Sequence, residues 1–148
     1  LSGGSYFPGA ASSSDRVASG PYFVEFAEKA KPLTRVPLVV TGGFKTRTQA
    51  VDTLAKNGAD AIGLARALVL EPSLPQDWLA DNDGKLTFPS FSSPPPGGIT
   101  AWFSMRLTAI GNDEEARFNP ELQTAIDEYE DRDDARCAVW RSRFGEAQ

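Results

Sequence analysis

Two short hydrophobic segments, each ended by a glycine turn and followed by a helical pattern, constrain the fold of this chain more than any other feature. The first runs from Val36 to Thr41 and the second from Asp60 to Leu64. The first is continuous and rich in β-branched residues, without alternation of polar and apolar positions, which is typical of a strand buried on both faces of a parallel sheet. We therefore expect two neighbouring strands here.

A helix is expected between these two strands. Thr46 and Gln49 have the spacing of a capping box, in which the two side chains satisfy main-chain N–H groups at the start of a helix. Asn57 and Gly58 follow as a stop signal, with Gly58 expected in the left-handed conformation. The predicted buried stripe of this helix consists of Ala50, Val51, Leu54 and Ala55.

Helical patterns also flank the strands. Pro21 stands where a first helical residue belongs, and Pro32 ends the pattern that follows it. A further helix is expected to start near Ala65 and to end before Pro72. The order helix, strand, helix, strand, helix over residues 22–70 predicts βα units and a parallel sheet. The apolar stripe of the first helix consists of Tyr22, Phe23, Phe26, Ala27 and Ala30.

The character of the sequence changes in residues 76–148. Residues 89–98 are rich in Pro, Ser and Gly and read as a linker. Thr100 is expected to cap a helix that ends near Ile110, and Pro120 to start a long helix that packs by one face. The expected anchors are Trp102, Phe103, Leu107 and Ile110 in the first helix and Leu122, Ile126, Tyr129, Trp140 and Phe144 in the second.

The composition excludes several kinds of chemistry. The chain has no His, which removes the commonest general base and metal ligand, and its single Cys137 allows no internal disulfide, cysteine-rich zinc site or iron–sulfur cluster. A formal net charge of −5 argues against nucleic acid as a partner. No apolar run approaches the roughly 20 residues of a membrane span. We expect a cytoplasmic protein that holds no metal and binds neither nucleic acid nor membranes.

The glycine turns after the two strands are candidate ligand-binding elements. Gly42 and Gly43 follow the first strand, and the segment from Gly63 to Arg66 ends the second. In parallel α/β folds ligands bind at this end of the sheet. Glycine allows a ligand to approach the backbone, N–H groups at a helix start attract anions, and the guanidinium of Arg66 matches phosphate oxygens. Because residues 1–75 carry a net charge of +2 and the rest −7, the sequence favours a phosphate site at these turns.

The same residues carry a resemblance to a known family. The segment from Val36 to Phe44, the segment from Gly58 to Leu68 and the Glu-Pro-Ser-Leu-Pro run of residues 71–75 resemble the end of the barrel in the old yellow enzyme family. These are FMN-dependent NAD(P)H oxidoreductases, ene-reductases among them. An arginine such as Arg66, followed by an acidic residue and then Pro-x-Leu-Pro as in residues 71–75, distinguishes this family from other phosphate-binding barrels.

By this resemblance the fold class is α/β, the C-terminal portion of a (β/α)8 TIM barrel. Residues 1–75 would supply about strands 7 and 8 with their flanking helices, and residues 76–148 a linker and a helical C-terminal extension. Residues 1–4 are similar to the end of strand 6, and residues 22–27 to the helix before strand 7. Since a complete barrel needs about 250 residues, we expect a longer protein whose N-terminal barrel portion is the partner of this chain.

The resemblance also implies which residues bind the cofactor. Backbone N–H groups of Gly43, Ala65 and Arg66 would donate to the FMN phosphate together with the Arg66 guanidinium, while Phe44 would pack near the flavin edge. The implied cofactor-binding residues are Gly42, Gly43, Phe44, Gly63, Leu64, Ala65 and Arg66.

No catalytic residue is expected in this chain. Members of the family bind the activating oxygen of the substrate with a pair of His or His and Asn side chains and often protonate carbon from a Tyr, all on earlier strands. A chain without His lacks that pair, and we assign the acid role neither to Tyr6 nor to Tyr22. The intact enzyme would pass hydride from NAD(P)H to a small-molecule electron acceptor, and this chain alone would be inactive. The open barrel edge would favour self-association into a homo-oligomer.

Two other interpretations remain open from the sequence. The same two turns could belong to a barrel that acts on a sugar phosphate or a nucleotide. Alternatively, the chain could be a non-catalytic interaction module whose binding surface lies on the helices that carry Trp102 and Trp140.

Overall fold

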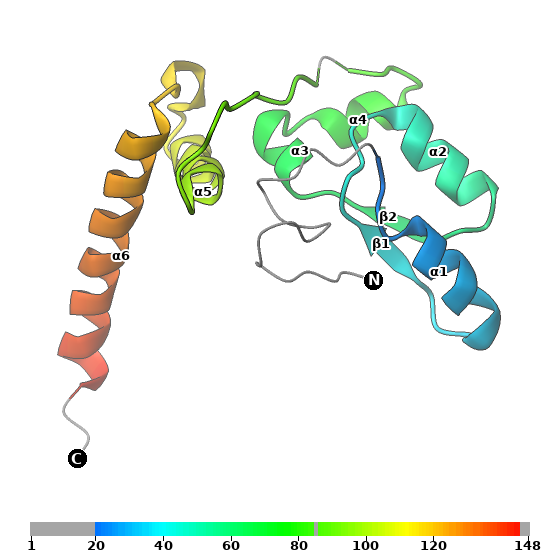
Figure 1. Cartoon of the computed structure of the whole chain (residues 1–148), viewed down its shortest axis with the longest axis horizontal. Helices are drawn as coiled ribbons and strands as arrows, with labels where there is room; N and C mark the ends of the chain where they lie inside the picture. Colours follow the sequence, from blue (N-terminus) through cyan, green and yellow to red (C-terminus); the bar gives the residue numbers. More distant parts are fainter. Residues whose placement is uncertain (1–19, 85, 146–148) are drawn as a thin grey trace. The chain divides into compact units, whose positions relative to one another are not determined.

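A computed structural model describes residues 20–84 and 86–145 of the chain. The described residues form two compact units that divide between Ser90 and Phe91 (Figure 1). We describe each unit by itself. Residues 1–4, which are similar to the end of a strand, and Tyr6 lie outside the described residues.

The first unit is built on a pair of parallel strands, β1 (Val39–Thr41) and β2 (Ala61–Gly63). Helix α2 (Arg47–Ala55) connects them, as the alternating sequence pattern predicted. In the register of the pair, Val39 lies opposite Ala61 and Thr41 opposite Gly63, so the two strands end at the same level. The predicted parallel pairing is confirmed.

Short helices precede and follow the strand pair (Figure 1). Helix α1 (Val24–Ala30) continues into the 3-10 turn η1 (Lys31–Leu33), and helix α3 (Arg66–Leu70) follows β2. The expected helical start at Pro21 is wrong, because α1 begins three residues later. The structure also contains α4 (Leu74–Leu79), which the sequence analysis missed. Pro75 lies in the first turn of α4, a position where proline is well tolerated.

Both ends of α2 show how local sequence sets a helix. Thr46 accepts a hydrogen bond from the backbone N–H of Gln49, and the Gln49 side chain accepts one from the N–H of Thr46, so the predicted capping box is confirmed. At the other end Asn57, with φ of 56°, takes the left-handed position that was expected for Gly58. The N–H of Gly58 then donates to the carbonyl of Thr53 at 2.9 Å, the bond that closes a Schellman turn.

The core of the first unit is small. Its buried residues are Ala27, Val40, Phe44, Ala50 and Ala59. The expectation that the first strand is buried on both faces is wrong for the described residues, because Val40 is fully buried whereas Val39 is 49 % exposed.

Two predicted helix faces are also only partly covered. In α2, Ala50 is buried but Val51 and Leu54 are exposed, and Thr53 is buried instead. Its hydroxyl donates to the carbonyl of Gln49, which satisfies the buried polar group. In α1 the predicted core residue Phe26 is exposed as well. Few described elements pack around α1 and α2. Part of the apolar face of each helix is therefore exposed.

The second unit consists of α5 (Gly98–Gly111), the 3-10 turn η2 (Glu115–Arg117) and α6 (Leu122–Phe144). Trp102 is the centre of its core. The ring of this tryptophan contacts those of Phe91, Phe103 and Phe118 edge to face, with centroids 5.2–5.6 Å apart. Aromatic pairs in this geometry add to the stabilisation that burial provides.

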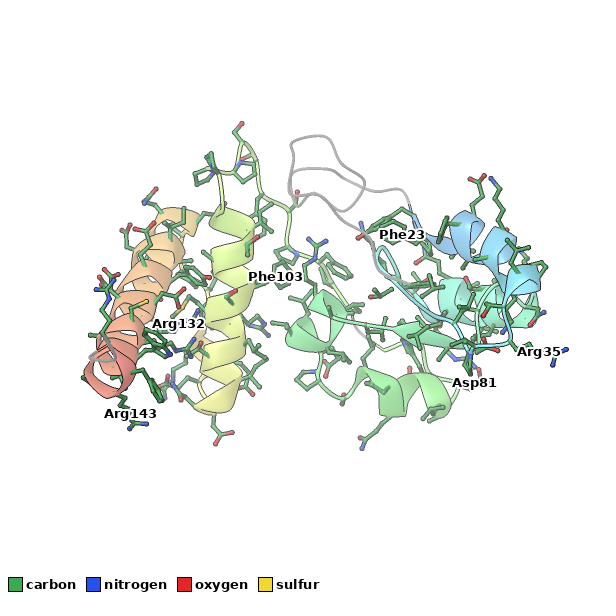
Figure 2. The ribbon with its side chains drawn as sticks, turned by 90° about the horizontal axis from the view of Figure 1, so that it is seen from below. Phe23, Arg35, Asp81, Phe103, Arg132 and Arg143 are labelled. Carbon is green, nitrogen blue, oxygen red and sulfur yellow. The ribbon has the colours of Figure 1, made fainter. Side chains whose placement is uncertain are left out.

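Arg132 ties α6 to α5. Its guanidinium donates to the hydroxyl of Thr108 on α5 at 3.1 Å and lies 4.7 Å from the ring centroid of Tyr129. Figure 2 shows Arg132 on the side of α6 that faces α5, and Arg143 near the end of α6.

Three expectations for the second unit are wrong. Helix α5 begins at Gly98, behind Gly97 in the left-handed conformation, so Thr100 is not its cap. The expected anchor Leu107 is exposed. Helix α6 packs by one face only over its first half, since every residue from Asp134 to Phe144 is exposed. Among the described residues, no helix is long and apolar enough to cross a membrane.

Candidate functional site

The strand register brings the two glycine turns side by side. Because Thr41 lies opposite Gly63 in a parallel pair, Gly42 and Leu64 leave the sheet from the same edge. Each of the two segments then leads into a helix: α2 follows the first turn and α3 follows the second. The two turns that the sequence singled out therefore meet at the carboxyl end of the sheet.

The first turn depends on glycine for conformation and for space. Gly42 and Gly43 have φ of 103° and 82°, which side-chain-bearing residues rarely adopt. A Cβ atom on Gly42 would lie 2.6 Å from the ring of Tyr22, and one on Gly43 would lie 2.2 Å from the carbonyl oxygen of Gly20. Packing within the protein thus gives these glycines a structural role independent of any ligand.

Tyr22 is the residue of this turn that sequence reasoning placed elsewhere. It was read as one member of the apolar stripe on the first helix, but it lies in the turn before α1. Its half-buried ring packs against Gly42 and stands edge to face with Phe23, at 4.9 Å between centroids. The pattern of apolar residues carried no signal for this contact, which depends on how α1 is placed against the strands.

The second turn is tight for a different reason. Gly63 has no positive φ, but a Cβ atom there would lie 3.0 Å from the Cβ of Thr41, so glycine permits close strand packing. Ala65 and Arg66 are exposed at the start of α3. Since α3 has only five residues, its macrodipole contributes little, and main-chain amides with the Arg66 guanidinium are the groups that could bind an anion.

Main-chain donors at the two turns fit an anionic group. In the part of the chain that the structure describes, no acceptor is recorded for the N–H groups of Gly43 and Ala65. Two such donors on adjacent strand ends, with a guanidinium beside the second, match the oxygens of a phosphate. Phe44 is buried in the core beneath the first turn, so it supports the turn from inside.

Lys45 adds a second cation that the sequence analysis did not consider. It follows Phe44 directly, its N–H donates to the Gln49 side chain at 2.8 Å, and its ammonium lies 5.6 Å from the ring centroid of Phe88. No cluster of His, Cys, Asp and Glu that could hold a metal ion occurs among the described residues.

Curated relatives match parts of this chain. The NADH-dependent flavin oxidoreductase iliE of Neonectria sp. (strain DH2) is 43% identical over 61 residues, which are 40% of this chain and 8% of the relative. The protein of the same name in Hypocrea jecorina (strain QM6a) is 34% identical over 94 residues, 59% of this chain and 23% of the relative. The NADH-dependent flavin oxidoreductase iccE of Talaromyces variabilis is 44% identical over 57 residues, 37% of this chain and 14% of the relative.

The chain spans less than a quarter of the length of each of these relatives. No family model matches it, and no solved structure does. The partial matches confirm the resemblance drawn from the sequence: over stretches of 57–94 residues, this chain is similar to proteins named NADH-dependent flavin oxidoreductases.

Proposed function

We propose that this chain supplies the phosphate-binding turns of an FMN-dependent NAD(P)H oxidoreductase. The observation that carries the proposal is the register of the strand pair, which sets Thr41 opposite Gly63 and so brings the two glycine turns together. The names of the relatives support a flavin as the cofactor and NADH as the reductant. A phosphate-binding site would favour a flavin that carries a phosphate, as FMN does.

Three kinds of group would hold the phosphate. The N–H groups of Gly43, Ala65 and Arg66 would donate from the main chain, and the guanidinium of Arg66 would add a permanent positive charge. A hydrogen bond to a charged group contributes about 1.5–3 kcal/mol. FMN bound here would supply hydride transfer from NAD(P)H to an electron-poor acceptor. The residues of this chain would position it and would take no part in the transfer.

The rest of the proposed enzyme would be the N-terminal strands and helices of a barrel. We propose that β1 and β2 correspond to about strands 7 and 8 of a (β/α)8 barrel, with the residues after β2 and α3 leading into the C-terminal extension. Exposed apolar residues support this, because Val36, Val39 and Leu33 present surface that further strands and helices would cover. The chain alone would then neither hold FMN tightly nor oxidise NAD(P)H.

Titration with FMN and with riboflavin tests the phosphate site, because riboflavin lacks only the phosphate. In ¹H–¹⁵N spectra of the 148-residue chain, FMN should shift the amide signals of Gly43, Ala65 and Arg66, whereas riboflavin should leave them unchanged. Arg66→Ala should weaken the response at least about tenfold if one charged hydrogen bond is lost. Arg35→Ala, at an exposed arginine of the same unit, is the matched control (Figure 2).

Three results would each contradict a part of the proposal. Equal shifts with riboflavin would show that the phosphate is not recognised. Shifts with ribose 5-phosphate that exceed those with FMN would favour the sugar-phosphate alternative. A yellow, purified sample of this chain that turns over NADPH would contradict the expected inactivity.

A further inference from the structure

The aromatic ring of Tyr22 lies along the first glycine turn. Its hydroxyl oxygen is 2.7 Å from the position that a Cβ atom on Gly42 would take, and its Cδ1 atom is 2.9 Å from the corresponding position on Gly43. The ring therefore spans both glycines, with its hydroxyl end beside Gly42. Because neither glycine carries a side chain, the ring can approach their backbone this closely.

Packing holds the ring of Tyr22 in this place. The ring stands edge to face with that of Phe23, which packs against the core of the first unit, and it also contacts Gly42. A side chain that is fixed before a ligand arrives loses little conformational entropy when the ligand binds. Tyr22 is therefore preorganised at the carboxyl end of β1.

The hydroxyl of Tyr22 is available to a ligand. Within residues 20–84 and 86–145 it meets no hydrogen-bonding partner, and the side chain is only half-buried. The hydroxyl is also not among the buried polar atoms that lack a partner, so it is accessible from solvent. A tyrosine hydroxyl in a partly buried position usually donates to an acceptor. A ligand oxygen at the glycine turn would be such an acceptor.

We propose that the Tyr22 hydroxyl donates a hydrogen bond to the phosphate that the two glycine turns bind. The inference rests on the proposed function, to which it adds a side-chain donor. The hydroxyl end of the ring stands at Gly42, one residue before the main-chain N–H of Gly43 that is expected to donate to the phosphate. A neutral hydroxyl adds a donor without adding charge, because Arg66 already supplies the positive charge. Tyr22 would bind the phosphate and take no part in hydride transfer.

Tyr22→Phe tests the hydroxyl, because it keeps the ring and removes one oxygen atom. In ¹H–¹⁵N spectra of the 148-residue chain titrated with FMN, this variant should bind at least about tenfold more weakly, as expected when one hydrogen bond to a charged group is lost. Its response to riboflavin should equal that of the wild type. Tyr129→Phe, at a half-buried tyrosine of the second unit, is the matched control and should bind FMN normally. Thermal unfolding of both variants checks that the fold is retained.

Fluorine NMR tests the same contact without a substitution at the site. In a chain labelled with 3-fluorotyrosine, the signal of Tyr22 is identified as the one that Tyr22→Phe lacks. FMN should shift this signal and riboflavin should not, because riboflavin has no phosphate to accept the hydrogen bond. The signal of Tyr129 should stay in place with both flavins.

The failure of this inference can be distinguished from the failure of the proposed function. If FMN shifts no amide signal of Gly43, Ala65 or Arg66 in the wild type, both fail. If those signals shift but Tyr22→Phe binds FMN as tightly as the wild type, or the fluorine signal of Tyr22 does not move, only the role of Tyr22 is overturned. Equal weakening of FMN and riboflavin binding in Tyr22→Phe would also overturn it, because the hydroxyl would then contact a part of the flavin other than the phosphate.

Discussion

Lys31 and Asp60 form an ion pair that joins the turn after α1 to the residue before β2. The same Asp60 carboxylate accepts a hydrogen bond from the backbone N–H of Leu38 at 2.7 Å. The Lys31 ammonium, and then the Leu38 N–H, lower the pKa of Asp60 below its ordinary value of 3.8. One acidic side chain thereby connects the segments that enter both strands.

The stability of the first unit should therefore decrease in acid. A carboxyl group with a lowered pKa in the folded state stabilises the fold above its unfolded pKa, and that contribution is lost as the pH falls through the folded value. Asp60→Asn should lower the stability at pH 7 and flatten its dependence on pH below about 4. Chemical denaturation at pH 3, 5 and 7 measures both effects.

The matched control for Asp60 is Glu25→Gln. Glu25 also has a lowered pKa, from its hydrogen bond with Lys29, but that pair is exposed on one face of α1. Exposed pairs contribute little, so this variant should resemble the wild type. Equal acid sensitivity of Asp60→Asn and the wild type would contradict the role given to Asp60.

The capping box of α2 should have a measurable effect on stability. Thr46→Ala removes the acceptor for the Gln49 N–H and should cost about 0.5–2 kcal/mol in the free energy of unfolding. Thr48→Ala, at an exposed threonine inside the same helix, should change it little. Urea denaturation followed by circular dichroism compares the two variants, and a larger loss in Thr48→Ala would argue against the cap.

Gly43 should tolerate no side chain. Gly43→Ala combines an unfavourable φ of 82° with a clash against the Gly20 carbonyl, and we expect a loss above about 2 kcal/mol. Gly97→Ala separates these causes, because Gly97 has φ of 80° but no atom near the position of a Cβ. That variant should lose only about 1 kcal/mol. Equal losses in thermal denaturation would show that the contact with Gly20 is unimportant.

Arg132 should contribute more to the stability of the second unit than Arg136 does. Arg132→Ala loses the bond to Thr108 and the contact with Tyr129, and should cost about 1 kcal/mol. Arg136→Ala removes an arginine of the same helix that, among the described residues, forms only one ion pair, a long one at 3.9 Å to Asp133. It should cost much less. Fluorescence of Trp102, monitored during denaturation, follows the loss of packing around α5.

Features set by a few neighbouring residues could be predicted from the sequence. The capping box at Thr46 and Gln49 requires only the spacing of two side chains, and the structure has it. The parallel order of the strands followed from alternation with helices, and the meeting of the two turns followed from that order. The sequence thus located both turns of the candidate site.

Features that depend on packing could not be predicted in this way. The sequence does not show whether Asn57 or Gly58 takes the left-handed position, because both residues tolerate it. The periodicity of α6 places Trp140 and Phe144 on the packed face, but it cannot reveal that α5 covers only the first half. The contact of Tyr22 with Gly42 joins a turn to a strand end and leaves no local pattern.

The three tryptophans of the chain stand in three different surroundings. Trp78 is half-buried in the first unit, where its indole N–H donates to the carbonyl of Asp83. Trp102 is 5 % exposed in the core of the second unit, whereas Trp140 on α6 is 61 % exposed. The wavelengths of their emission maxima should therefore differ. In variants that keep one tryptophan, Trp78 would report on the unfolding of the first unit, Trp102 on that of the second, and Trp140 on burial of the exposed second half of α6.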